Sequence, residues 1–228
     1  MVGKIYSIAE PNPSKDLIEK ISGQYSTILA DPPWQFQNRT GKVAPEHRRL
    51  LRYPTMEIKE IMELPVFRMA AARSHLYLWV PNALLMEGLK VMEAWGFTYK
   101  TNLVWYKVRK DGGPDGRGVG FYFRNVTELI LFGVRGSMRT LPAGRTQVNL
   151  FATRKREHSR KPDEIYDLVE ACSPGPYLEL FARFSQPGWH QWGNEDVEEN
   201  SLHGVAKRNG HIDRQLRLME SPKGYKAG

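Results

Sequence analysis

The stretch TILADPPWQF, residues 27–36, limits what this chain can fold into more than any other segment. The apolar run that leads into it, from Tyr25 to Ala30, predicts a buried parallel strand that ends at Asp31. Two prolines follow, which carry no backbone N–H and push the preceding residue toward extended geometry. Asp31 and the carbonyls of Pro32 and Pro33 therefore form a rigid, donor-free segment, and a group bound there has to donate hydrogen bonds.

Apolar runs alternate with helical patterns along the rest of the chain. We predict strands over 74–80, 97–108, 127–134 and 177–184, a helix capped by Asn82 that runs to Ala94, another helix from Pro162, and an irregular loop over 109–120. Alternation of this kind indicates an α/β fold with a mostly parallel central sheet and helices on both faces. Such folds bind ligands beyond the carboxyl ends of their strands, where Asp31 lies.

The chain of 228 residues is within the range of one α/β unit. We predict a single domain over 1–196 and a polar, basic C-terminal tail over 197–228. The single Cys172 excludes an intrachain disulfide framework and a Cys-based zinc site, and the six histidines show no paired helical spacing, so no metal site is predicted. The sequence shows neither a signal-peptide pattern nor a run of about 18 consecutive apolar residues. We therefore expect a cytoplasmic protein that does not span a membrane.

Basic residues outnumber acidic ones, 33 to 25, for a formal charge of +8. They gather in two clusters: one between residues 34 and 55, which includes Arg48, Arg49 and Arg52, and one over 154–161. One interpretation is two solvated loops. The other is contact with the phosphates of a nucleic acid, which would make binding steeply dependent on salt.

The donor-free segment suits an –NH₂ group, such as the exocyclic amine of adenine or cytosine. This amine is a poor nucleophile because its lone pair is delocalised into the ring. Acceptance of both hydrogens by the Asp31 carboxylate and the Pro32 carbonyl would favour the attacking lone pair and position it. Trp34 would add a flat face for base stacking. The simpler alternative is a strand-ending turn, since Asp and Pro are both turn residues.

Asp31-Pro32-Pro33-Trp34 resembles the catalytic motif of S-adenosylmethionine-dependent N6-adenine methyltransferases, the family of the catalytic subunit of eukaryotic messenger-RNA adenosine methyltransferase and its bacterial and phage relatives. Six further stretches agree in order: YPTM (53–56), LYLWV (76–80), VWYK (104–107), RKPDEIYDLVE (160–170), LELFAR (178–183) and GWHQWGNE (188–195). The resemblance spans about residues 25–195 and implies a Rossmann-like class I methyltransferase fold. The catalytic motif comes early and the cofactor strand late, as in the permuted class.

The resemblance also implies roles for single residues. Asp31 and Pro32, within the catalytic set Asp31, Pro32, Pro33 and Trp34, would hold the amine. Trp34 and Tyr53 would frame a flipped base, although a purely structural role for Tyr53 remains open. Lys161 would meet the carboxylate of S-adenosylmethionine, and the adjacent helix start would attract the same group; a solvated lysine is the alternative.

The remaining cofactor-binding residues implied by the resemblance are Asp31, Glu179, Arg183, Gln186, Asn194 and Glu195. Glu179 and Arg183 lie four apart, and we expect them on the same face of a strand. Gln186 stands where the messenger-RNA enzyme has a His-Asn pair, which weakens its assignment, and Asn194 with Glu195 could be an ordinary turn. No residue before Tyr25 can be assigned to the adenine of the cofactor.

The leading hypothesis is a DNA adenine-N6 methyltransferase with short or relaxed sequence preference, because the chain carries no evident separate recognition domain. An RNA adenosine methyltransferase is the runner-up, since only contacts to the 2′-hydroxyl would separate the two. Cytosine-N4 transfer is disfavoured because that chemistry resembles Ser-Pro-Pro-Tyr, and a non-catalytic nucleic-acid-binding subunit has no reason to keep the intact motif. Direct methyl transfer needs no metal and no nucleophilic cysteine. A homodimer or a partner subunit is left open.

Overall fold

A computed structural model describes residues 4–7, 13–35, 55–116, 122–154 and 160–193. The strands are β1 (Lys4–Ser7), β2 (Tyr25–Ala30), β3 (Ala70–Val80), β4 (Thr98–Val108), β5 (Thr127–Arg135), β6 (Leu150–Arg154), β7 (Tyr177–Leu180) and β8 (Trp189–Gly193). The helices are α1 (Pro13–Lys20), α3 (Ile58–Glu63), α4 (Val66–Met69), α5 (Leu85–Ala94) and α6 (Glu164–Cys172), with 3₁₀ turns η1 (Asn82–Leu84) and η2 (Pro142–Arg145). The predicted tail, residues 197–228, lies outside the described residues.

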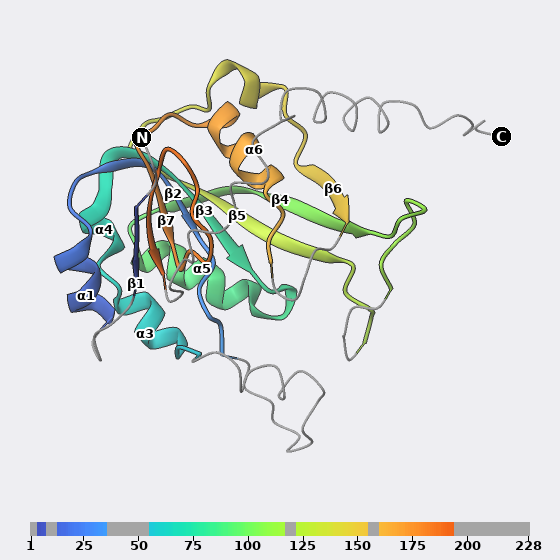
Figure 1. Ribbon diagram of the computed structural model, residues 1–228, viewed down its shortest axis with the longest axis horizontal. Helices are drawn as coiled ribbons and strands as arrows, with labels where there is room; N and C mark the ends of the chain where they lie inside the picture. The colour runs from blue at the N-terminus through green and yellow to red at the C-terminus, as the bar shows by residue number, and fades with distance from the viewer. Residues whose placement is uncertain (1–3, 8–12, 36–54, 117–121, 155–159, 194–228) are drawn as a thin grey trace. The chain divides into compact units, whose positions relative to one another are not determined.

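The eight strands form one sheet in the order β1-β8-β7-β2-β3-β5-β4-β6 (Figure 1). Only β5 is antiparallel to its neighbours, β3 and β4, whereas the other pairs are parallel. The late strand β7 lies next to the early strand β2, with Leu29 opposite Glu179 and Ala30 opposite Leu180. The Rossmann-like, mostly parallel sheet predicted from the sequence is therefore confirmed, and it brings the carboxyl ends of β2 and β7 together.

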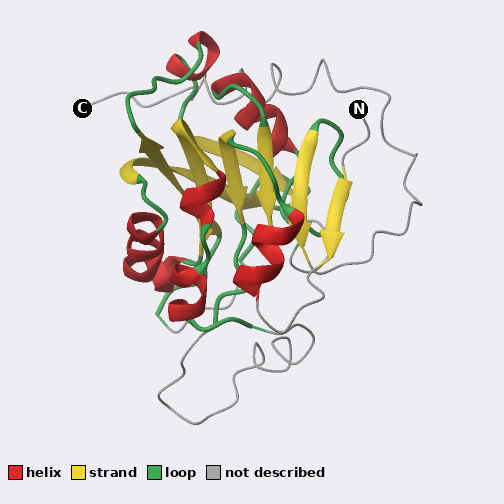
Figure 2. Cartoon of the chain, turned by 90° about the vertical axis from the view of Figure 1, so that its left-hand side faces the viewer, coloured by secondary structure: helices red, strands yellow, loops and turns green. Residues whose placement is uncertain are grey.

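Helices cover both faces of the sheet, as predicted (Figure 2). Side chains alternate across a strand, so Leu76 and Leu78 of β3 pack in a core with α1, α3, α4 and α5. Tyr77 and Trp79 of the same strand point the other way and pack with α6. Both faces of β3 are thus largely apolar, as expected for an inner strand of a sheet covered by helices on both sides.

Several elements begin or end at other residues than the sequence predicts. Asn82 does not cap α5: its side-chain amide donates to the carbonyl of Thr127 (3.1 Å), and η1 intervenes. Strand β7 ends at Leu180 rather than at residue 184, because Phe181 adopts a φ of 66° and turns the chain. Arg183 therefore lies beyond the strand, and the prediction that it shares a strand face with Glu179 is wrong.

The sequence patterns did not predict three strands, β1, β6 and β8, or three helices, α1, α3 and α4. These elements are four to eight residues long, too short for a clear periodicity. Of the helices in the described part of the chain, none is long and apolar enough to cross a membrane.

Candidate active site

The segment after β2 is fixed by backbone hydrogen bonds. The Asp31 N–H donates to the Leu180 carbonyl of β7 (3.3 Å), and the Pro33 carbonyl accepts the N–H of Met56 (2.9 Å). The Pro32 carbonyl, expected to accept the amine, already accepts the N–H of Trp34 (2.8 Å). A carbonyl oxygen has two lone pairs, so one acceptor position remains. The segment is therefore rigid, as its prolines predict, and still offers acceptors.

Trp34 is placed differently from the prediction. Its side chain is only 5% exposed, packs in the core with α3 and α5, and donates its indole N–H to the Trp79 carbonyl (2.9 Å). An indole buried in this way presents no free face to a base. The expected stacking role of Trp34 is thus corrected: the residue anchors the segment that carries Asp31 to β3.

Four side chains of alternating charge meet at the carboxyl ends of the strands, and we call them the charged row: Asp31, Lys161, Glu128 and Lys107. Lys161 Nζ lies 3.0 Å from Asp31 Oδ1 and 3.3 Å from Glu128 Oε2, and Lys107 pairs with Glu128 Oε1. Asp31, Lys161 and Glu128 are 19%, 25% and 28% exposed, so solvent screens these pairs only in part. The charged row crosses the strand ends from β2 to β4.

Two tryptophan rings pack against the two lysines of the charged row. Lys161 Nζ lies 5.0 Å from the centre of the Trp79 ring, and Lys107 Nζ lies 4.9 Å from that of Trp105. The two indoles contact each other edge to face, with centroids 5.9 Å apart. Both ammonium groups thus gain cation–π attraction in addition to their carboxylate partners.

Two members of the charged row, Lys161 and Glu128, hold their charges at neutral pH. Burial alone would lower the pKa of Lys161, but the carboxylates of Asp31 and Glu128 outweigh it and the pKa lies above its usual value. Burial likewise acts to raise the pKa of Glu128, yet the two neighbouring lysines bring that pKa below its usual value. Lys161 is therefore a permanent cation that fixes one oxygen of Asp31.

A second polar group surrounds Glu179 of β7, and we call it the Glu179 cluster: Glu179, Tyr166, Gln191 and the loop after β7. The Tyr166 hydroxyl lies 3.0 and 2.9 Å from the two carboxylate oxygens, and the Gln191 side-chain amide also donates to the carboxylate. The same amide donates to the Phe184 carbonyl (2.8 Å), while its oxygen accepts the N–H of Gln186 (2.7 Å). Gln191 thus ties Glu179 to the loop.

Glu179 titrates in a different range from a solvated carboxyl. Burial raises its pKa from 4.5 to about 7, against the hydrogen bonds from Gln191 and Tyr166, which lower it; the charge of Asp31 raises it further. Burial and the carboxylate of Glu179 also place the pKa of Tyr166 well above its usual value. Tyr166 therefore stays a hydrogen-bond donor while Glu179 changes its charge near neutral pH.

The residues at this edge fit a ligand such as S-adenosylmethionine by their chemistry. The carboxylates of Asp31 and Glu179 suit ribose hydroxyls, an ammonium or a sulfonium, whereas Lys161 and Arg160 suit a carboxylate. Arg160 stacks over Phe184, 4.5 Å from its ring centre, and donates to Asp163 through Nη2 (3.3 Å). Its Nε is buried and has no hydrogen-bond partner in the described part of the chain, which leaves a donor for such a carboxylate.

The structure brings together Asp31, Lys161 and Glu179, all predicted site residues, at the adjoining ends of β2 and β7. Gln186 contributes a backbone N–H to the Glu179 cluster, and the charge of Arg183 acts on Lys161. The other predicted site residues, Arg48, Arg49, Arg52, Tyr53, Asn194 and Glu195, lie outside the described residues.

Sequence reasoning missed Glu128, Lys107, Tyr166 and Gln191. Glu128 and Gln191 are polar residues with apolar neighbours in the strands TELILFGVR and WHQWG. Buried polar groups need partners, so their positions were a usable signal. Among the described residues no group of three or more His, Cys, Asp or Glu side chains could hold a metal ion.

Proteins of similar sequence indicate the family to which the chain belongs. The sequence model of the family described as MT-A70 matches residues 25–195, more than half of the chain. The chain is 29% identical over 206 residues to the Type II methyltransferase M.MunI of Mycoplasma sp, a match that covers 83% of this chain and 84% of that protein.

Two eukaryotic proteins match a shorter part. A putative N(6)-adenosine-methyltransferase MT-A70-like protein of Medicago truncatula is 29% identical, and the human N(6)-adenosine-methyltransferase catalytic subunit METTL3 is 27% identical, each over 181 residues. Both matches cover 77% of this chain but only 27% and 29% of those proteins. The chain thus spans less than a third of the length of these eukaryotic relatives.

Proposed function

Because the chain belongs to the MT-A70 family, we propose that it transfers the methyl group of S-adenosylmethionine to the N6 amine of adenine in DNA. Methyltransferases of this family use S-adenosylmethionine. The observation that carries the proposal is Asp31, which follows β2 beside two prolines and has one carboxylate oxygen fixed by Lys161 at 3.0 Å. This arrangement offers acceptors to an amine and nothing that competes as a donor at Pro32 or Pro33.

The chemistry assigned to these residues is amine activation. When bound, S-adenosylmethionine supplies an electrophilic methyl group on a positive sulfur. Lys161 engages Asp31 Oδ1, and we assign Oδ2 and the second lone pair of the Pro32 carbonyl to the two hydrogens of the amine. Transfer of that methyl group would give the adenine nitrogen a new N–C bond in place of the S–C bond, and Asp31 would be the adjacent base for the one proton that the amine then loses. Positioning and electrostatics of this kind lower a barrier without a covalent enzyme intermediate.

The same proposal assigns the cofactor to the carboxyl ends of β2 and β7. Glu179 and Asp31 would accept hydrogen bonds from its hydroxyl or ammonium groups, while Arg160 and Lys161 would face its carboxylate. Arg183, Gln186, Asn194 and Glu195 remain proposed cofactor-binding residues. Residues 1–196 would form the transferase domain and 197–228 a tail.

The proposal assigns nucleic-acid contact to residues outside the described ranges. Arg48, Arg49 and Arg52 would contact phosphates, and Tyr53 would contact the flipped base. Reversal of the three arginine charges should weaken binding and flatten its dependence on salt, by about one unit of slope for each phosphate that is no longer neutralised.

DNA is favoured over RNA by the extent of the matches. The match covers 84% of the Type II methyltransferase but only 27% and 29% of the two eukaryotic adenosine methyltransferases. The adenosine methyltransferase activity of the second pair makes RNA adenosine the other candidate. Both substrates would use the same amine chemistry at Asp31.

Purified protein incubated with methyl-labelled S-adenosylmethionine and matched DNA and RNA oligonucleotides tests the proposal. We expect label in DNA that contains adenine, and N6-methyldeoxyadenosine after digestion to nucleosides. Label in RNA alone would replace DNA by RNA as the substrate. Label on cytosine would refute the assigned base, and no label in either polymer would refute the enzyme itself.

A further inference from the structure

Tyr122 and Phe123 are the most exposed large apolar side chains in the described part of the chain, at 95% and 85%. The next most exposed one, Met86, reaches 64%. Single exposed apolar residues are common, but two adjacent aromatic rings that contact almost nothing are a costly surface for an isolated protein. Neither ring belongs to the hydrophobic core of the described residues, so a role outside the core has to be sought for them.

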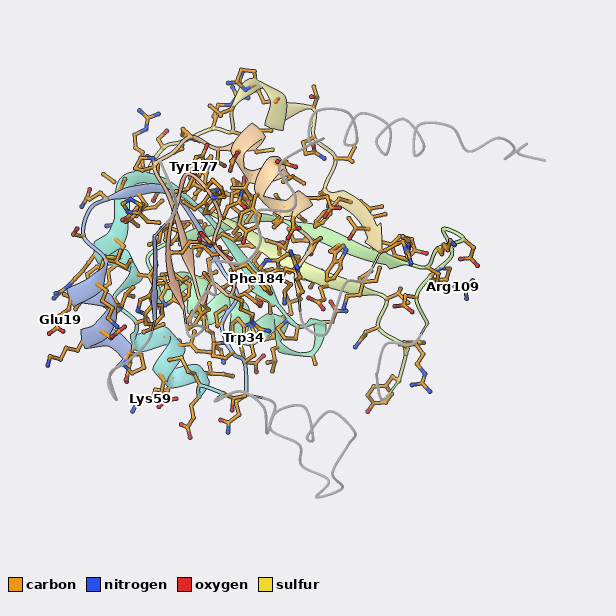
Figure 3. All side chains as sticks on the ribbon, in the orientation of Figure 1. Glu19, Trp34, Lys59, Arg109, Tyr177 and Phe184 are labelled. Carbon is orange, nitrogen blue, oxygen red and sulfur yellow. The ribbon has the colours of Figure 1, made fainter. Side chains whose placement is uncertain are left out.

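The two rings lie in the connection between the antiparallel strands β4 and β5. Tyr106 pairs with Thr127, whereas β3 already ends where Val80 pairs with Leu129. The described parts of the β4–β5 connection, residues 109–116 and 122–126, therefore lie past the carboxyl end of β3; we call them the finger. Figure 3 shows Arg109 of the finger well away from Trp34 in the body. The finger thus projects from the same edge of the sheet that carries Asp31.

The base of the finger is part of the candidate active site. The Lys107 N–H donates to the Val126 carbonyl (2.8 Å), which closes the finger, and the Lys107 side chain pairs with Glu128. Glu128 contacts Lys161, which contacts Asp31. Tyr122 and Phe123 stand only four and three residues before Val126. The finger and Asp31 thus share one edge of the sheet and are joined through Lys107, Glu128 and Lys161, so a polymer bound along this edge would run from Asp31 toward the rings.

The charges of the finger favour a polyanion. Arg124 follows the two rings directly, and Arg109 and Lys110 lie in the turn that follows β4. Arg109 is paired with Asp111 (3.0 Å), and both are largely exposed. Aromatic rings beside cations are the combination by which proteins bind single-stranded nucleic acid, with bases on the rings and phosphates on the cations.

We propose that Tyr122 and Phe123 form a stacking platform for the bases that flank the target adenine. The proposal rests on the function proposed above, since it assumes a nucleic-acid strand at Asp31. The rings would stabilise the unstacked neighbours of a base that has left its strand, which costs a few kcal/mol in a duplex. Stacking tolerates any base, so the platform would add affinity without sequence preference.

The test compares Tyr122→Ala/Phe123→Ala with the wild-type chain by fluorescence anisotropy on a labelled single-stranded DNA that contains one adenine. We expect the dissociation constant to rise about tenfold or more, the loss typical of a removed stacking ring. The slope of affinity against salt should stay unchanged because no cation is removed. The affinity for S-adenosylmethionine, measured by calorimetry, should also stay unchanged.

Two further variants make this test specific. Tyr122→Phe/Phe123→Trp keeps both rings and should retain wild-type affinity. Phe67→Ala removes a 48%-exposed ring from α4, which precedes the amino end of β3, and should leave DNA binding unchanged. Equal affinity of the wild-type and double-alanine proteins would overturn the platform. So would a change of self-association in sedimentation without loss of DNA affinity, because the rings would then cover a protein interface.

The outcomes separate this inference from the proposed function. If the wild-type protein methylates DNA and the double-alanine variant binds equally well, only the platform fails. If the wild-type protein binds DNA through the rings but transfers no methyl group, the platform stands and the enzymatic proposal fails. If the wild-type protein binds no nucleic acid, both fail.

Discussion

The carboxyl ends of β2 and β7 each carry a carboxylate, and the two are held by opposite means. Asp31, after β2, is paired with the cation of Lys161 at 3.0 Å. Glu179, in β7, receives neutral donors from Tyr166 and Gln191. The strands are adjacent, yet two lysines bring the pKa of the buried Glu128 in the charged row below its usual value, whereas burial beside neutral donors raises the pKa of Glu179 to about 7. Buried carboxyl groups thus acquire different pKa values according to the charge of their partners.

This difference suggests a division of labour. The ion pair with Lys161 suits the group that receives the amine, because it holds the Asp31 carboxylate in place through the reaction. A carboxylate with neutral donors suits a binding role, because it contacts uncharged or positive parts of a ligand. The predictions below test whether the two ends are as distinct as their contacts indicate.

The largest effect is expected from Asp31→Asn. This change keeps the shape of the side chain but replaces an acceptor by an amide donor, so kcat/KM for methyl transfer should fall by about 10²–10³-fold. The labelled-methyl assay measures it, with DNA affinity and the melting temperature as checks on folding. Glu179→Gln serves as the matched comparison and should lose less activity. Loss of equal size in both variants would erase the distinction between the two ends.

The second prediction concerns the pH dependence of stability. The pKa of Glu179 is about 7 in the folded protein, above its ordinary 4.5, so the folded state binds the proton more tightly. The contribution of Glu179 to stability is therefore full below pH 4.5 and is lost as pH rises to 7, by up to about 3 kcal/mol.

Urea unfolding at pH 5 and pH 7.5 measures this loss. Glu179→Gln cannot ionise, so its free energy of unfolding should rise relative to wild type between these two pH values. A difference between the two proteins that does not change with pH would show that Glu179 is as freely charged as a surface carboxylate.

Tyr166→Phe should change the free energy of unfolding by a smaller amount, which also depends on the charge of Glu179. The hydroxyl bonds both oxygens of Glu179 at 3.0 and 2.9 Å, and its loss should cost about 1–2 kcal/mol of unfolding free energy. The cost should be greater at pH 8 than at pH 5, because a hydrogen bond to an ionised carboxylate is stronger. Tyr177→Phe is the control: its hydroxyl donates to the Ser173 carbonyl (2.9 Å), a neutral acceptor, so that loss should not vary over this range.

The smallest effect is expected at the turn that ends β7. Phe181 has a φ of 66°, which is unfavourable for a residue with a Cβ, and its ring packs edge to face on Trp192. Replacement by alanine or glycine loses the same packing, but glycine also relieves the backbone. Phe181→Gly should therefore be more stable than Phe181→Ala by about 1 kcal/mol in urea unfolding. The usual order, with alanine more stable, would show that the turn is not strained.

The end of β2 was predictable from its own residues. An apolar run, an acid and two prolines define a strand end and a donor-free segment without reference to any distant residue, and Asp31 lies where they predict. The end of β7 was not predictable in the same way. The pattern YLELFARF predicts a strand to residue 184, and only the positive φ of Phe181 shows that the chain turns earlier.

The residues that contact the two carboxylates were likewise only partly predictable from the sequence. The placement of Lys161 near the site came from resemblance to known sequences, and its contact with Asp31 and Glu128 came from the structure. The burial of Trp34 overturned a stacking role that its aromatic character favoured. Neither a tryptophan nor a lysine carries in its local sequence the information on what will pack against it.

By itself, the sequence determined the α/β class, the strand that presents Asp31 and the acceptor character of the segment after it, because hydrophobic periodicity and proline geometry act over a few residues. The tertiary structure alone decided that β7 lies beside β2, that Lys161 is shared by two carboxylates, and that Glu179 is enclosed by Tyr166 and Gln191. These features depend on strand order and on burial, which set the charge of each group through residues far apart in the chain.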